Sequence, residues 1–257
     1  MEEGIFIAGT DTGVGKTVIA GAIARALSLT GVDVGVMKPV ETGCQKKNGK
    51  LVPSDATYLK AAARTRDPIK WITPYRFQSA LSPRAAALQE KKEIKLEEVL
   101  RAYDQLRRRH AFIIVEGAGG LLVPLTAHLD LLDLITLLNL PVLLVGRSGL
   151  GTLNHTLLTL RCGSTAGIRF TGIIFNQITP SRSLADETNP ASLAERTDIP
   201  LLGVLPYFKK SGKKEREIER SEKLLMANQL LKRTVLGWTY NRSSDSGESG
   251  TGVGLLE

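Results

Sequence analysis

The chain has 257 residues, 42% of them hydrophobic, and a net charge of +8. This composition supplies enough apolar material for the core of one large α/β domain or two small ones. The two cysteines, Cys44 and Cys162, cannot form a disulfide framework, and the three histidines are too dispersed for a zinc motif. The basic residues form scattered clusters without interleaved aromatic residues, so we expect no nucleic acid partner.

The first residues of the chain and its most apolar stretch indicate where in the cell the protein is located. The first residues, 1–4, are acidic and lack the charge pattern of a signal peptide. The apolar stretch 129–146 contains Asp130, Asp133 and Pro141, which favours a buried helix and strand over a membrane span. We therefore expect a cytoplasmic protein that does not bind a membrane.

Apolar runs and helical patterns alternate along the chain. The first element is a strand at 5–8, followed by a turn rich in Gly, Thr and Asp and a helix that starts near Val18. Further strands are expected at 33–37, 112–115, 141–145, 170–175 and 201–205. Helices are expected at 54–64, 84–90, 95–109, 130–138, 152–162, 191–197 and 217–232. Ser54 is a candidate N-cap for the first of these, and residues 68–83 are expected to be irregular.

The strands read as continuous Val, Ile and Leu, which is typical of parallel strands buried on both faces. The expected fold class is therefore α/β, a single domain with a mostly parallel sheet covered by helices on both faces. We assign this domain to residues 1–242. Residues 243–257 are rich in Ser and Gly, with almost nothing to bury, and are expected to form a disordered tail.

The turn after the first strand, GTDTGVGKT at 9–17, predicts a phosphate-binding loop. Its glycines let backbone N–H groups turn toward an anion, and the next helix adds the positive end of its dipole. Lys16 would reach the β- and γ-phosphates, and the Thr17 hydroxyl would bind magnesium. Five residues separate Gly9 from Gly15 where the common pattern has four, and a Gly-rich turn that binds nothing is the alternative.

Charged side chains follow other predicted strands, and ligands of open α/β sheets bind beyond the carboxyl ends of the strands. Lys38 ends the second strand and could neutralise a phosphoryl group that is being transferred, or it could be a surface lysine. Glu116 ends a buried strand at a position suited to magnesium. Asp55 is a second candidate ligand, although alone it reads as an ordinary residue of a helix's first turn.

Two weaker signals lie further along the chain. The Asn176 amide could pair with the N6/N7 edge of adenine, but Asn is also common at turns. The helix start at 151–154 could hold a carboxylate or phosphate on its free N–H groups, or Thr152 could be a simple N-cap.

Taken together, the motifs resemble the dethiobiotin synthetase family, whose fold is P-loop NTPase-like. The matching stretches occur in the family's order: GTDTGVGKT (9–17), KPVETG (38–43), SDA (54–56), SP (82–83), VEGAGG (115–120), LGTLNHTLLT (150–159), Asn176 with TP (179–180), and LLGVLP (201–206). The five-residue spacing in the phosphate loop is the family's own. The set is much more specific than any single motif.

The resemblance implies an ATP- and magnesium-dependent ring closure in biotin biosynthesis. One amine of 7,8-diaminononanoate takes up CO₂ as a carbamate, and ATP converts the carbamate to a carbamic-phosphoric anhydride. The second amine then closes the ring and releases phosphate. Such an enzyme mainly positions the reactants and neutralises charge.

The resemblance also implies roles for particular residues. The catalytic residues would be Thr12, Lys16 and Lys38. The nucleotide would be bound by Gly13, Val14, Gly15, Lys16, Thr17, Val18, Asp55, Glu116, Gly117, Ala118, Gly119, Asn176, Gln177, Leu205, Pro206 and Tyr207. The substrate would be bound by Thr42, Ser82, Gly151, Thr152, Leu153 and Asn154, the last four across a homodimer interface. The Mg²⁺ ligands would be Thr17, Asp55 and Glu116.

Two residues depart from the family's pattern, and three other kinds of nucleotide-binding protein fit the sequence less well. Arg84 stands where the family often has His, and Gly13 stands where some members have an acidic residue. The amidating synthetases of cobalamin synthesis usually carry a glutaminase domain, for which we expect no room. Partitioning ATPases have a second loop lysine at the position of Asp11. A dinucleotide-binding turn does not fit the Gly15-Lys16-Thr17 pattern.

Overall fold

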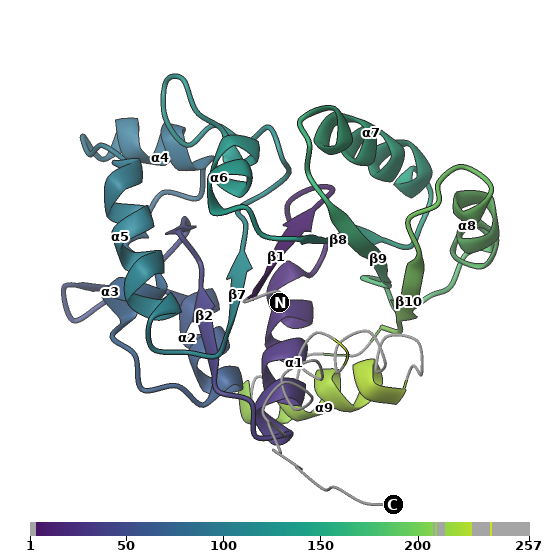
Figure 1. Cartoon of the computed structure of the whole chain (residues 1–257), viewed down its shortest axis with the longest axis horizontal. Coiled ribbons are helices and arrows are strands. Elements are labelled where there is room, and N and C mark those ends of the chain that lie inside the picture. The colour runs from purple at the N-terminus through teal and green to yellow at the C-terminus, as the bar shows by residue number, and fades with distance from the viewer. Residues whose placement is uncertain (1–3, 208, 210–213, 228–236, 238–257) are drawn as a thin grey trace, which may run out of the picture.

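The central sheet has six parallel strands, and strand β1 lies in its interior (Figure 1). The computed structural model describes residues 4–207, 209, 214–227 and 237. The strand order is β10 (Leu201–Leu205), β9 (Phe170–Asn176), β8 (Val142–Arg147), β1 (Gly4–Gly9), β7 (Phe112–Glu116) and β2 (Val34–Met37). Because every neighbouring pair is parallel, all six carboxyl ends meet at one edge of the sheet.

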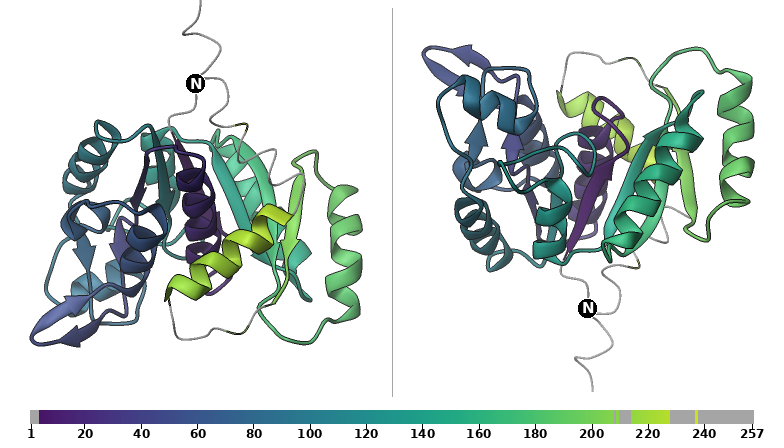
Figure 2. Two further views of the ribbon diagram at one scale, coloured as in Figure 1. Left: turned by 90° about the horizontal axis from the view of Figure 1, so that it is seen from below. Right: turned by 90° about the horizontal axis from the view of Figure 1, so that it is seen from above.

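Helices cover both faces of the sheet, which confirms the predicted fold class (Figure 2). Ile5 and Ile7 of β1 pack toward one face, and Phe6 and Ala8 pack toward the other. The first face is covered by α1 (Lys16–Leu29), α2 (Ser54–Ala63) and α9 (Lys214–Ala227). The second face is covered by α4 (Pro83–Gln89), α5 (Leu96–Arg107), α6 (Leu131–Leu138), α7 (Thr152–Thr165) and α8 (Leu184–Ala194).

One expectation about the segment after β2 is wrong, and the segment also contains a hairpin that was not expected. Residues 68–83 are not wholly irregular, because they contain α3 (Ile69–Ile72) and β6 (Tyr75–Arg76), and β6 pairs with β3 (Val40–Glu41). The polar stretch before α2 forms a hairpin of β4 (Gln45–Lys47) and β5 (Lys50–Val52). Its turn residues, Asn48 and Gly49, have φ values of 49° and 76°, as a tight hairpin turn requires.

The helix expected at 191–197 is also displaced, since α8 spans Leu184–Ala194. It begins at a capping box in which Ser183 Oγ donates to Asp186 Oδ2 at 2.6 Å and the backbone N–H of Ser183 donates to the same oxygen at 2.7 Å.

Ser54 is the first residue of α2, with Pro53 at the N-cap position. The expected part of the last helix after residue 227 and the expected tail lie outside the described residues. Within the described part, no helix combines the length and apolar character needed to cross a membrane.

Candidate active site

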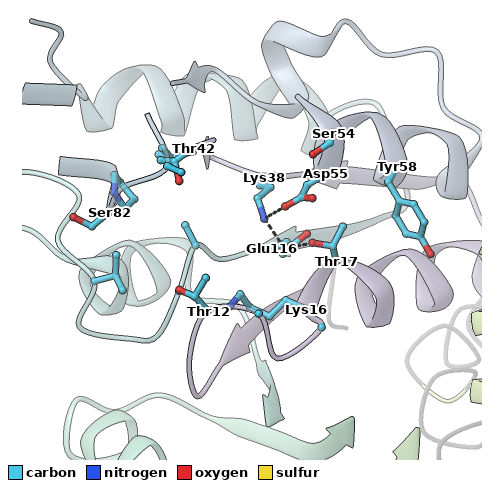
Figure 3. A pocket seen from close by; sticks show the side chains of 18 of the residues that line it. Thr12, Lys16, Thr17, Lys38, Thr42, Ser54, Asp55, Tyr58, Ser82 and Glu116 are labelled. Carbon is cyan, nitrogen blue, oxygen red and sulfur yellow. Dashed lines mark hydrogen bonds and ion pairs between the residues drawn. The ribbon is translucent and has the colours of Figure 1, made fainter. Parts of the chain in front are cut away.

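A cavity of about 770 Å³ opens at the carboxyl edge of the sheet (Figure 3). Many sequence-predicted site residues line it: Thr12, Gly13, Gly15, Lys16, Thr17, Val18, Lys38, Thr42, Asp55, Ser82, Glu116, Ala118 and Gly119. They come from segments far apart in the sequence. The cavity therefore joins the phosphate loop to the ends of β2 and β7 and to the start of α2.

The phosphate loop joins β1 to α1 and carries backbone conformations that favour glycine. Gly13 and Gly15 have φ values of 77° and 100°. The N-cap residue of α1 is Gly15, which has no side chain that could accept a hydrogen bond. The first N–H groups of the helix therefore receive no cap from the N-cap residue, and they lie at the end of α1 that meets the cavity. The Nζ atom of Lys16 donates to the carbonyl oxygen of Asp11 at 2.8 Å. This arrangement is suited to an anion held by the loop.

Asn176, at the end of β9, packs against the phosphate loop. Its Nδ2 donates to the carbonyl oxygen of Val14 at 2.9 Å. A Cβ atom on Gly15 would overlap this Asn176 nitrogen. The amide therefore holds the loop from the side, a contact that the sequence did not predict.

Lys38 lies between two carboxylates and is buried (Figure 3). Its Nζ is 2.9 Å from Asp55 Oδ2 and 2.6 Å from Glu116 Oε1. Burial alone would lower the pKa of Lys38, but the charges of Glu116 and Asp55 raise it well above its usual value. The ammonium group therefore stays charged.

Lys16 is also buried but has a different electrostatic environment. Burial lowers its pKa to about 8; Glu116 opposes this shift, and the charge of Lys38 adds to it. Two lysines thus lie at the same cavity, one firmly cationic and one whose charge is less strongly stabilised. An anion bound between them would stabilise both charges.

The oxygen atoms of Thr17 and Glu116 in the cavity are suited to bind a magnesium ion. Thr17 Oγ1 donates to Glu116 Oε1 at 2.7 Å, while the buried Glu116 Oε2 has no hydrogen-bond partner among the described residues. No group of three or more His, Cys, Asp or Glu suited to a metal occurs in the described part of the chain. A cation here would therefore share its coordination with phosphate oxygens and water, as Mg²⁺ commonly does.

Thr42 and Ser82 lie at the opposite end of the cavity from Tyr58 (Figure 3). Ser82 is the N-cap residue of α4, and Thr42 directly follows β3. Ala80, Leu81 and Val123 add apolar surface to the cavity lining. This end is suited to a partly apolar ligand that carries polar groups.

Some predicted residues do not line the cavity. Val14 is buried in the core, and Gly117 packs against Phe6 and Leu131. Asn176 ends β9 and Gln177 follows it. The backbone N–H of Gln177 donates to the carbonyl oxygen of Leu205 at 2.9 Å, so these residues form a neighbouring group with Pro206 and Tyr207.

The segment 151–154 opens α7 and is also outside the cavity lining. Thr152 is fully buried, whereas the preceding Leu150 is 85% exposed. Leu153 is half-buried against the core and Asn154 is exposed. This chain therefore does not bring the segment to its own cavity.

Sequence reasoning missed several residues of the lining. They are Val40, Ser54, Tyr58, Ala80, Leu81, Pro83, Val123 and Glu217. Tyr58 lies three residues after Asp55, one helical turn away, so that spacing could have identified it. Glu217 had no local signal, because α9 comes from the far end of the chain and packs against α1.

Comparison with solved structures supports the fold. A ParA family ATPase from Chlorobium tepidum TLS aligns with a TM-score of 0.52 and 14% identity, covering 93% of this chain and 98% of that one. The septum site-determining protein MinD complexed with Mg-ADP from Pyrococcus horikoshii OT3 aligns with a TM-score of 0.54 and 18% identity, covering 93% and 96%. At these identities the similarity concerns the fold alone.

Comparison with known sequences is more specific. A family model described as "AAA domain" matches residues 3–215. The ATP-dependent dethiobiotin synthetase of Thermodesulfovibrio yellowstonii is 42% identical over 221 residues, which is 83% of this chain and 92% of that protein. The one from Bacillus subtilis strain 168 is 39% identical over 203 residues, or 79% and 87%. With such identity over most of both chains, this chain belongs to the family of ATP-dependent dethiobiotin synthetases, and it is a ligase that forms C–N bonds.

Proposed function

We propose that this enzyme converts 7,8-diaminononanoate, CO₂ and ATP to dethiobiotin, ADP and phosphate, as a step of biotin biosynthesis. One observation carries the proposal: a single cavity joins the phosphate loop and Lys38 to a partly apolar end with Thr42 and Ser82. ATP and a short diamine acid could therefore both bind in this cavity, next to each other. The volume of about 770 Å³ lies within the usual range for small-molecule sites.

The reaction needs little covalent chemistry from the protein. A carbamate formed from one amine and CO₂ attacks the γ-phosphorus of ATP and becomes a mixed anhydride, with ADP leaving. The second amine attacks the anhydride carbon, closes the five-membered ring, loses a proton and expels phosphate. Lys16 and Lys38 would neutralise the negative charge that gathers on the transferring group, and Thr12 would contact the reacting oxygens.

We assign Mg²⁺ to Thr17, Asp55 and Glu116. The ion would supply positive charge to the phosphate oxygens. The support is the buried, unpartnered Glu116 Oε2 among the described residues, together with the Thr17 hydroxyl beside it. Lys38 already bridges Asp55 and Glu116, so the two carboxylates are close enough to act on one nucleotide.

Residues 13–18, from the phosphate loop and the start of α1, would hold the phosphates together with residues 117–119. We place the adenine near Asn176 and Gln177, with the segment 205–207 beside them. The contact between Gln177 and Leu205 supports this grouping. Tyr207 is 37% exposed and offers ring surface for stacking.

We further propose that two copies of the chain form a homodimer. The segment 151–154 lies outside this chain's cavity, so the N–H groups at this helix start would serve the substrate carboxylate in a partner's site. The N–H of Thr152 is the exception, because it donates to the carbonyl oxygen of Gly149 at 3.2 Å. Exposed leucines on α7 and just before it, Leu150 at 85% and Leu158 at 58%, provide apolar surface for such an interface.

We also propose that residues 1–242 form the synthetase domain. The enzyme would act in the cytoplasm on small molecules, without nucleic acid or membrane partners.

An incorporation assay tests the function. The enzyme is supplied with ATP, Mg²⁺, diaminononanoate and labelled bicarbonate, and acid-stable label is measured in the product. We expect label only when all components are present. ATP hydrolysis without fixed label would contradict the proposal.

A further inference from the structure

Glu41 is a buried carboxylate at the end of the short strand β3, and its oxygens point at the start of α2. Oε1 accepts from the backbone N–H of Asp55 at 2.9 Å and from Ser54 Oγ at 3.3 Å. Oε2 accepts from the backbone N–H of Ala56 at 2.9 Å. All three donors belong to the first turn of the helix. Glu41 therefore caps α2 from another element of the fold.

Helix α2 needs this cap because its own N-cap position is occupied by Pro53. Proline has no polar side chain that could accept from the first N–H groups of the helix. A negative group at a helix N-terminus is also stabilised by the helix dipole. Glu41 thus supplies both the acceptors and the charge that the local sequence lacks.

The same helical turn carries Asp55, whose carboxylate faces Lys38 at 2.9 Å. Lys38 and Glu41 are three residues apart. The first holds the Asp55 side chain and the second holds its backbone N–H. Asp55 is therefore fixed at two points by one short segment, with its carboxylate turned into the cavity.

Burial makes this arrangement costly. Desolvation raises the pKa of Glu41, and the two backbone hydrogen bonds from Ala56 and Asp55 oppose that shift. The hydrogen bonds from the first turn of α2 are therefore what keeps this carboxylate in a buried position.

We propose that Glu41 is a positioning residue, which holds the first turn of α2 so that Asp55 faces the cation and phosphates of the bound nucleotide. This inference rests on the role proposed above for Asp55. Glu41 itself is not among the residues that line the cavity, and it acts through the backbone of Asp55 and Ala56.

The test measures ADP binding as a function of Mg²⁺ concentration, by titration calorimetry on the full chain. Glu41→Gln keeps the size of the side chain but turns one acceptor into a donor that faces an N–H group. We expect this variant to need about tenfold more Mg²⁺ for half-maximal ADP binding, as for other groups that orient metal ligands. Asp55→Asn should raise the requirement at least as much, and the double variant should match Asp55→Asn alone.

Asp67→Asn is the matched control. Asp67 is also buried and also accepts several hydrogen bonds, but its partners Thr65, Arg109 and His110 lie away from the cavity. The Asp67→Asn substitution should leave the Mg²⁺ requirement for ADP binding unchanged. A Pro53→Ser substitution would give α2 a local N-cap, and in the Glu41→Gln background it should restore part of the Mg²⁺ affinity and of the stability.

The outcomes separate the two proposals. If Asp55→Asn changes the Mg²⁺ requirement but Glu41→Gln does not, the role of Glu41 is wrong and that of Asp55 stands. The same conclusion about Glu41 follows if the double variant shows the product of the two single effects, or if Asp67→Asn matches Glu41→Gln. If Asp55→Asn has no effect, the cation role of Asp55 fails, and the positioning role of Glu41 fails with it.

Discussion

The Nζ atom of Lys38 lies 2.6 Å from Oε1 of Glu116, and both side chains are buried at the edge of the sheet. The same nitrogen reaches Asp55 at 2.9 Å. One cation thus balances two carboxylates where the phosphates are expected to bind. Lys38 is consequently important for stability as well as for the proposed reaction.

Replacing Lys38 by alanine should therefore impair both properties. Removing one stabilising charge from the reaction centre typically lowers kcat by about 10²- to 10³-fold. Breaking a buried ion pair also costs about 3 to 5 kcal/mol of unfolding free energy. Steady-state turnover on the folded fraction and urea denaturation measure the two effects separately.

Lys92→Ala is the control, because Lys92 forms an exposed ion pair with Glu90 at 3.0 Å. It should change stability by less than about 1 kcal/mol and leave turnover unchanged. Full activity of folded Lys38→Ala would show that Lys38 does not act on the reacting groups.

Thr17 tests the proposed cation site, since its hydroxyl donates to Glu116 at 2.7 Å. Thr17→Ser keeps the hydroxyl, and we expect its Mg²⁺ requirement to stay within about threefold of wild type. Thr17→Ala removes a ligand and should raise the Mg²⁺ concentration for half-maximal activity by about tenfold or more. A Mg²⁺ titration at saturating ATP compares the two. Equal curves for serine and alanine would mean that the hydroxyl is not a ligand.

Much of this fold could be predicted because parallel strands buried on both faces leave a plain signal of continuous apolar runs. The meeting of Lys38, Glu116 and Thr17 could be predicted for a related reason. Lys38 directly follows β2, Glu116 ends β7, and Thr17 comes just after the loop that follows β1. The carboxyl ends of these parallel strands share one edge of the sheet. Local sequence and one topological rule were sufficient for these residues.

Other features had local signals that were not used. The Asn48-Gly49 pair marks the hairpin of β4 and β5, since both residues adopt positive φ. The spacing of Ser183 and Asp186 marks the true start of α8. These turn and cap residues predict the hairpin and the first residue of α8 correctly.

The contacts of Asn176 and Glu41 had no such signal. Asn176 meets Val14 across a sequence separation of 162 residues, and nothing near either residue indicates the other. Glu41 accepts from a helix that begins after an intervening hairpin. Such contacts depend on the relative placement of elements, which residue patterns do not encode.

Asp67 provides a prediction about pH and stability. Burial would raise its pKa, but hydrogen bonds from Thr65 and His110, with the charges of His110 and Arg109, lower it below the usual value. A carboxylate whose pKa is lower in the folded state stabilises the fold above its unfolded pKa of about 3.9. That contribution is lost as the pH falls through the folded pKa.

Asp67→Asn should therefore lower the unfolding free energy at pH 7 by about 1 to 3 kcal/mol. The difference from wild type should begin to shrink once the pH falls below about 3.9, where the unfolded carboxylate starts to take up a proton. Urea denaturation at pH 7, 5 and 3 provides the comparison. A difference that stays constant over this range would show that ionisation of Asp67 does not contribute to stability.

Gly15 and Asn176 allow a suppressor experiment on the phosphate loop. Gly15→Ala should weaken Mg·ADP binding more than tenfold, because its Cβ would overlap the Asn176 amide and its φ is 100°. In an Asn176→Ala background the nearest remaining atom of that residue would be its Cβ, at 3.7 Å. The double variant should then bind better than Gly15→Ala alone, although it keeps a backbone cost of about 1 to 2 kcal/mol and also loses the Asn176 amide.

Gly13→Ala separates this clash from backbone strain. Gly13 also has positive φ, at 77°, but a Cβ there would meet no described atom within 4 Å. Gly13→Ala should therefore bind Mg·ADP at least as well as the double variant, and clearly better than Gly15→Ala. If Gly13→Ala is as damaging as Gly15→Ala, strain in the loop explains both, and contact with Asn176 is not what restricts position 15.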